Sequence, residues 1–277
     1  MRRASRFYRA LVWIVAVWAL VGCGAASGEP VEPADGGSGG KEGGTLTVFA
    51  ASSLTDAFGE LAEVFEERNP GVEVRATFAA SSVIVTQILQ GAPADVFATA
   101  DQAKMRAAVE RGVVAGEPEV FARNKELVVV PEGNPARIED LRDLAKPGVK
   151  LVLAQDGVPA AEYAGEILDK AEVRYREDFE EKVLSNLVSR EPDVRVAVNR
   201  VALGDADATF GYASDVTPDM EGRVEIVEIP EGLNVVAAYP IAALEGSESS
   251  GLARRWIGLV LSDEGQRVLR EWGFQPA

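Results

Sequence analysis

Short apolar segments alternate along this chain with longer segments in which apolar side chains recur at helical spacing. The first unit joins a strand predicted at residues 46–50 to a helix whose apolar face is formed by Leu54, Phe58, Leu61 and Phe65. Two further units of the same kind follow it. Strand, turn and helix in succession are typical of a parallel α/β sheet. The pattern therefore predicts an α/β fold.

The same alternation continues to the C-terminus. The predicted strands are residues 46–50, 72–78, 95–99, 127–130, 150–154, 208–212, 224–229 and 235–244. The predicted helices begin after Ser53, Ser82 and Asp101 and, further along, occupy residues 138–145, 159–171, 179–188, 193–203, 250–261 and 263–271. The apolar runs near residues 127 and 237 are candidates for crossovers between two lobes.

Composition restricts the function. The 277 residues include no histidine and one cysteine, and 28 Lys and Arg against 44 Asp and Glu give a formal net charge of −16. Without histidine the chain cannot form a Ser-His-Asp triad, a Cys-His nucleophile or an imidazole zinc site. The negative charge argues against a nucleic-acid partner. A non-enzymatic function is therefore favoured.

The first 44 residues predict export and anchoring. Four arginines precede twelve apolar residues at positions 10–21, a run that is short for a bilayer span and typical of a signal peptide. Cys23 follows Leu-Val-Gly, which resembles a lipobox. We predict a lipoprotein signal peptide at residues 1–22, lipidation of Cys23, and a flexible glycine-rich tether over residues 23–44. A transmembrane anchor, or a signal peptide with an incidental cysteine, is the alternative.

Small or hydroxylated residues lie where three predicted strands lead into helices. The segments are 49–55 (Phe-Ala-Ala-Ser-Ser-Leu-Thr), 78–83 (Phe-Ala-Ala-Ser-Ser-Val) and 158–161 (Val-Pro-Ala-Ala). Such turns meet at the carboxyl ends of the strands, where helix N-termini offer unpaired N–H groups to an anion. A serine there can also be an ordinary N-cap, as we predict for Ser53. The repeated Phe-Ala-Ala-Ser-Ser favours an anion pocket made of dipoles.

Four segments closely resemble the molybdate-binding proteins of bacterial molybdate ABC transporters. They are residues 48–58, 91–102, 210–215 (Phe-Gly-Tyr-Ala-Ser-Asp) and 271–274 (Glu-Trp-Gly-Phe). The resemblance covers residues 45–277 and implies the type II periplasmic-binding-protein fold. In that fold two α/β lobes, each a mostly parallel sheet flanked by helices, are joined by two crossover segments and close on the ligand. Lobe I would comprise residues 45–125 plus 235–277, and lobe II residues 126–234.

The resemblance also implies five residues that bind the oxygens of molybdate. They are Ser53, Ser81 and Tyr212 through their hydroxyls, and Ala160 and Val194 through their backbone N–H groups. Ser52 and Ser82 are the alternates. Each group is a hydrogen-bond donor, which suits a tetrahedral dianion that only accepts hydrogen bonds. The metal would be bound as an oxyanion, without direct metal ligands and without a cofactor.

The expected function is the capture of molybdate or tungstate outside the cytoplasm and its delivery to an ABC transporter permease. We expect a monomer, lipid-anchored to the outer face of the cell membrane or periplasmic. Three alternatives stay open: a receptor for another tetrahedral oxyanion such as sulfate, an extracellular ligand-sensing module, and a hydrolase that uses Ser53 or Ser81.

Overall fold

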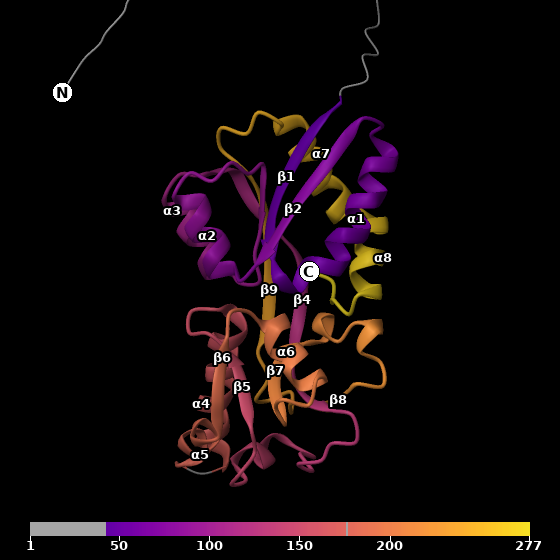
Figure 1. Cartoon of the computed structure of the whole chain (residues 1–277). Helices are drawn as coiled ribbons and strands as arrows, with labels where there is room; N and C mark the ends of the chain where they lie inside the picture. The colour runs from indigo at the N-terminus through magenta and orange to yellow at the C-terminus, as the bar shows by residue number, and fades with distance from the viewer. Residues whose placement is uncertain (1–42, 176) are drawn as a thin grey trace, which may run out of the picture. The chain divides into compact units, whose positions relative to one another are not determined.

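The computed structural model describes residues 43–175 and 177–277 (Figure 1). The predicted signal peptide, the lipidation of Cys23 and nearly all of the predicted tether lie outside the described residues. The first strand begins at Gly44, one residue before the predicted start of the folded part at Thr45. Within the described ranges, every helix is too short or too polar to cross a bilayer.

A first group of strands lies in the upper half of Figure 1. β1 (Gly44–Ala51) pairs in parallel with β2 (Val72–Ala79) and with β3 (Val96–Ala98). β9 (Val236–Leu244) is antiparallel to β3, and the first part of β4 (Val114–Pro131) is antiparallel to β9. The accompanying helices are α1 (Thr55–Arg68), α2 (Ser81–Leu89), α3 (Gln102–Glu110), α7 (Ser250–Leu261) and α8 (Asp263–Glu271).

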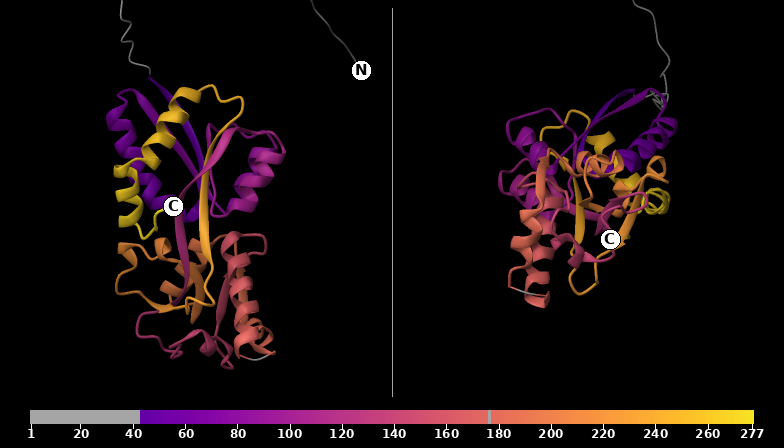
Figure 2. Two further views of the ribbon diagram at one scale, coloured as in Figure 1. Left: turned by 180° about the vertical axis from the view of Figure 1, so that it is seen from behind. Right: turned by 60° about the horizontal axis from the view of Figure 1, so that its bottom comes forward.

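Helices cover both faces of this first group. Successive residues of a strand point to opposite faces, so Val48 packs with α1, α7 and α8, whereas Phe49 packs with α2 and α3. The left view of Figure 2 shows these two sets of helices on opposite sides of the strands. Phe58 of α1 meets Trp256 of α7 edge-on, with ring centroids 5.4 Å apart. Burial on both faces explains why β1 is almost continuously apolar.

A second group of strands lies below the first in Figure 1. β5 (Leu151–Ala154) pairs in parallel with β6 (Leu187–Glu191) and β7 (Ala208–Tyr212), while the second part of β4 is antiparallel to β7 and to β8 (Val224–Glu228). The accompanying helices are α4 (Pro159–Tyr175), α5 (Phe179–Ser185) and α6 (Val194–Ala202), with 3-10 turns η2 (Leu141–Ala145), η3 (Ala213–Asp215) and η4 (Pro218–Met220).

β4 belongs to both groups. Lys125 pairs with Val236 of β9, and the next residue, Glu126, pairs with Tyr212 of β7. β4 and β9 are the strands that contain the apolar runs near residues 127 and 237, and they pair with each other up to Lys125 and Val236. The assignment of residues 45–125 plus 235–277 and of 126–234 to two lobes stays a prediction, and the change of partner at residues 125 and 126 is consistent with it.

The predicted helices 138–145 and 179–188 were wrong in type or extent. Residues 138–145 contain only the 3-10 turn η2 (Leu141–Ala145). It begins at Leu141 because Asp140 caps it, accepting a hydrogen bond from the Arg142 N–H. The predicted helix 179–188 ends at Ser185, and its last residues belong to β6. β6 has a mixed apolar and charged sequence at the edge of the sheet, so its pairing with β5 decides its structure.

Candidate functional site

Ser53 lies in η1 (Ser52–Leu54), the 3-10 turn that joins β1 to α1. The prediction that Ser53 caps α1 was wrong, since α1 begins at Thr55 and no side chain caps it. The Ser53 Oγ lies 2.9 Å from the Tyr239 hydroxyl of β9 and the residue is 3% exposed. The extra turn therefore leaves the Ser53 hydroxyl free of the helix N-terminus and directs it to a buried tyrosine.

Ser81 is the first residue of α2. Its Oγ accepts a hydrogen bond from the Ala100 N–H at 3.1 Å, and the residue is 1% exposed. Because a hydroxyl has one proton and two lone pairs, Ser81 can still donate to a ligand while it accepts from Ala100. The Ala100 carbonyl accepts in turn from the Tyr163 hydroxyl of α4 at 3.4 Å. Ser82, the alternate, is only partly buried.

Ala160 and Val194 lie in the first turns of α4 and α6, where backbone N–H groups have no carbonyl partner within the helix. Asp193 caps α6 as predicted, by accepting a hydrogen bond from the Val196 N–H at 3.1 Å. Ala160 and Val194 are each 3% exposed and belong to the same apolar cluster as Leu54. The N-terminus of α6 packs against the turn that carries Ser53. Val158, just before α4, packs with Ala80, just before α2.

Tyr212 ends β7 and is 1% exposed. Its hydroxyl has no hydrogen-bond partner among the described residues. The Tyr212 ring meets the Tyr239 ring edge-on, with centroids 6.0 Å apart. Tyr239 is thus in contact with both Tyr212 and Ser53. Nothing in the apolar run of residues 235–244 distinguishes it as a site residue.

All five predicted ligand residues are buried where the two groups of strands meet. Two ion pairs bridge the groups next to them: Arg195 of α6 pairs with Asp56 of α1, and Lys104 of α3 pairs with Glu162 of α4 at 2.9 Å. Arg195, the positive side chain next to Val194, is therefore already paired with Asp56. The predicted ligand groups themselves are hydroxyls and backbone N–H groups, which are uncharged donors.

Two buried carboxyl groups lie next to Tyr212, and neither was selected from the sequence. Asp215 accepts a hydrogen bond from the Tyr212 N–H at 3.0 Å, and burial raises the pKa of Asp215 to about 7. Glu126 pairs across the strands with Tyr212; burial, and then the charge of Asp215, raises the pKa of Glu126 well above its ordinary value. Burial thus shifts both carboxyls toward the neutral form, which is also a hydrogen-bond donor.

Metal ligation by side chains is not supported. Among residues 43–175 and 177–277, no cluster of His, Cys, Asp or Glu side chains is arranged to hold a metal ion. Hydroxyls and helix N-termini suit an oxyanion, since every acceptor atom of such a ligand can be matched by a donor.

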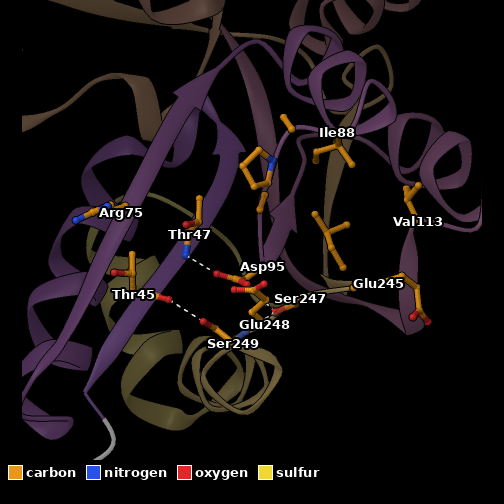
Figure 3. Close-up of a pocket in the computed structure, with 16 residues that line it drawn as sticks. Thr45, Thr47, Arg75, Ile88, Asp95, Val113, Glu245, Ser247, Glu248 and Ser249 are labelled. Carbon is orange, nitrogen blue, oxygen red and sulfur yellow. Dashed lines mark hydrogen bonds between the residues drawn. The ribbon is translucent and has the colours of Figure 1, made fainter. Parts of the chain in front are cut away.

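A surface cavity of about 600 Å³ lies at the opposite edge of the first group of strands, near the start of β1 and β3 (Figure 3). Several of its polar groups already bind one another: Asp95 accepts from the Thr47 N–H at 2.8 Å and from the Ser247 hydroxyl at 2.6 Å, and Ser249 donates to the Thr45 carbonyl at 2.8 Å. Ligands of α/β sheets gather at the carboxyl ends of the strands. The cavity is therefore not the candidate site.

Comparison with known proteins agrees with this fold. The Mycobacterium tuberculosis protein named molybdate-binding protein ModA is 38% identical over 265 residues, which cover 95% of each chain. The solved structure of the sulfate-binding protein SubI from the same species has a TM-score of 0.76 at 20% identity, covering 84% of this chain and 87% of that one. The Azotobacter vinelandii periplasmic molybdate-binding protein has a TM-score of 0.73 at 17% identity, covering 84% and 99%.

These likenesses show the predicted fold class, that of the type II periplasmic binding proteins. The family model described as bacterial extracellular solute-binding protein matches residues 46–275, nearly the whole described chain. The chain belongs to the bacterial extracellular solute-binding proteins.

Proposed function

We propose that this protein binds molybdate, and tungstate equally, outside the cytoplasm and delivers it to the permease of an ABC transporter. The observation that carries the proposal is the convergence of buried donors: the Tyr212 hydroxyl without a partner, the Ser53 and Ser81 hydroxyls, and two helix N-termini. Identity of 38% with the mycobacterial molybdate-binding protein over almost the full chain supports the same ligand.

The donor set favours a dianion that carries no proton. Each hydrogen bond to a charged acceptor contributes roughly 1.5–3 kcal/mol, so five of them can outweigh the entropic cost of holding one small ion. Hydrogen phosphate would bring a proton into the same ring of donors and leave it without an acceptor. The S–O bonds of sulfate are shorter than the Mo–O bonds of molybdate. When the lobes close, sulfate would therefore lie within hydrogen-bond distance of fewer donors.

Ligand entry requires motion, because the predicted ligand residues are nearly inaccessible to solvent. We propose that residues 45–125 plus 235–277 and residues 126–234 are lobes that separate at β4 and β9. The ion pairs from Arg195 to Asp56 and from Lys104 to Glu162 would then break on opening and form again on closure. The bound anion shifts this equilibrium because only the closed form surrounds it.

The remaining parts of the proposal concern location. The lipobox-like sequence at Cys23 supports lipid anchoring at the outer face of the cell membrane, with the glycine-rich residues 23–44 as a tether. The protein would act as a monomeric receptor without catalytic activity, since the predicted site contains serine hydroxyls but no histidine that could activate them.

Titration calorimetry with molybdate, tungstate, sulfate and phosphate tests the proposal. We expect molybdate and tungstate to bind with similar Kd, sulfate at least about tenfold more weakly, and phosphate not measurably. Equal binding of sulfate and molybdate would replace the proposal by the sulfate-receptor alternative. Heat from none of the four anions would favour a ligand-sensing role for another compound.

A further inference from the structure

Glu126 is an unusual residue for the centre of a protein. It is fully buried on β4, and neither carboxyl oxygen has a hydrogen-bond partner among the described residues. The ion pairs of residues 43–175 and 177–277 do not include it. A buried carboxylate without a partner is strongly unfavourable, whereas a neutral carboxylic acid costs far less.

The neighbours of Glu126 include acids and tyrosines. It lies directly opposite Tyr212 in the β4–β7 pairing, so both side chains leave the same face of the sheet. Asp215 of η3 and Tyr163 of α4 are close enough to interact electrostatically with it. Arg195 of α6, which interacts electrostatically with Asp215, is bound to Asp56.

The polar residue two positions earlier on β4, Asn124, shares that face but does not compensate Glu126. The Asn124 side-chain amide donates to the Ser214 hydroxyl at 2.8 Å. Asn234, before β9, donates to the backbone carbonyl of Glu126 at 2.9 Å and leaves the carboxyl group untouched. No group of the described chain thus stabilises a negative charge on Glu126.

A negative charge here would oppose the proposed ligand in two ways. It would repel a dianion across a poorly polarisable interior, where Coulomb interactions are strong. Its field would also act on the hydroxyl dipole of Tyr212, the residue opposite it on β7, and turn the proton away from the anion. A protonated carboxyl instead adds a neutral donor to a region that is otherwise made of donors.

We propose that Glu126 is a positioning residue that must carry its proton for the oxyanion to bind, so that anion capture is linked to the protonation of this one carboxyl. The inference rests on the proposed function. When the anion meets protein with Glu126 ionised, one proton from solvent forms a bond to the Glu126 carboxylate oxygen as the complex forms. When the proton leaves, the complex is weakened and the anion dissociates.

Infrared difference spectroscopy and calorimetry test this together on the purified protein. The C=O stretch of a protonated carboxyl, absent in Glu126→Gln, is titrated upward from about pH 6 to find its midpoint. The Kd for molybdate is then measured on both sides of that midpoint. Because Asp215 also titrates near pH 7, the comparison is made between the wild type and Glu126→Gln. Above the Glu126 midpoint we expect the wild type to lose about tenfold more affinity per pH unit than Glu126→Gln does.

Glu119→Gln provides the matched control, because Glu119 is an exposed carboxyl on the same strand. It should keep the wild-type pH dependence. The inference is overturned if Glu126 is already ionised at neutral pH, or if the Kd is the same across the midpoint, or if Glu126→Gln loses affinity in parallel with the wild type. Failure of the proposed function is recognised separately, by absence of molybdate binding at every pH. The infrared titration decides the protonation of Glu126 even then.

Discussion

Replacement of Tyr212 by phenylalanine separates the ligand-binding function of the tyrosine from its structural one. The substitution keeps the ring, and with it the edge-on contact to Tyr239 at 6.0 Å. Only the hydroxyl is removed, which has no partner among the described residues. Ligand-free and ligand-bound protein should therefore respond in opposite directions.

The magnitudes follow from burial. A buried hydroxyl without a hydrogen bond costs about 1–3 kcal/mol, so Tyr212→Phe should raise the free energy of unfolding of the ligand-free protein by up to that amount. In the complex the hydroxyl donates to a charged oxygen, a bond that contributes about 1.5–3 kcal/mol. Its loss should raise the Kd for molybdate about 10- to 150-fold.

Urea unfolding without ligand and titration calorimetry with molybdate measure the two effects. Tyr239→Phe is the matched control, since the Tyr239 hydroxyl has a buried partner, the Ser53 Oγ at 2.9 Å. That variant should lower the free energy of unfolding by about 1 kcal/mol. If Tyr212→Phe binds molybdate like the wild type, the Tyr212 hydroxyl is not a ligand. If it loses stability as Tyr239→Phe does, that hydroxyl has a structural partner.

Three further predictions concern the neighbours of the site. The pKa of Asp215 is raised from 3.8 to about 7, so the folded protein keeps this proton to a higher pH than the unfolded protein does. Stability should therefore fall as pH rises from about 4 to about 7, by up to about 4 kcal/mol; Asp215→Asn, unfolded in urea at both ends of that range, should lack this loss. Ser81→Ala removes the acceptor of a buried N–H and a ligand donor, so stability and molybdate affinity should each fall by about 1–3 kcal/mol, whereas Ser82→Ala should change neither. Arg195→Ala breaks the pair with Asp56 and should speed molybdate release up to about tenfold in stopped-flow measurements, with no further effect of Asp56→Ala in the double variant.

The strands and helices that the sequence predicted well are those with a clear apolar period. α1, α7, α8, β2 and β7 fall within a few residues of the expected bounds, because their side chains pack on defined faces. β6 and the first part of β4 lack such a period. Residues 114–119 (Val-Ala-Gly-Glu-Pro-Glu) become strand through pairing with β9, an interaction between segments far apart in the chain.

Only those parts of the candidate site that have a local sequence motif could be predicted. The serine-containing turns, the N-termini of α4 and α6 and the end of β7 each have a local signature. The partner of Ser53 does not, because Tyr239 is 186 residues away and its apolar neighbours indicate an ordinary core strand. Glu126 and Asp215 were likewise unpredictable, since their burial depends on which strands and turns surround them. Ser53 was assigned to a helix cap because the 3-10 turn between β1 and α1 has no sequence signal of its own.

Diffraction from crystals grown with molybdate, recorded at the molybdenum absorption edge, would show whether uncharged donors hold the anion. We expect one anomalous peak enclosed by the Ser53, Ser81 and Tyr212 hydroxyls and the first turns of α4 and α6, with no lysine or arginine touching the anion. A peak held by basic side chains, or located away from the contact between the two groups of strands, would contradict this expectation.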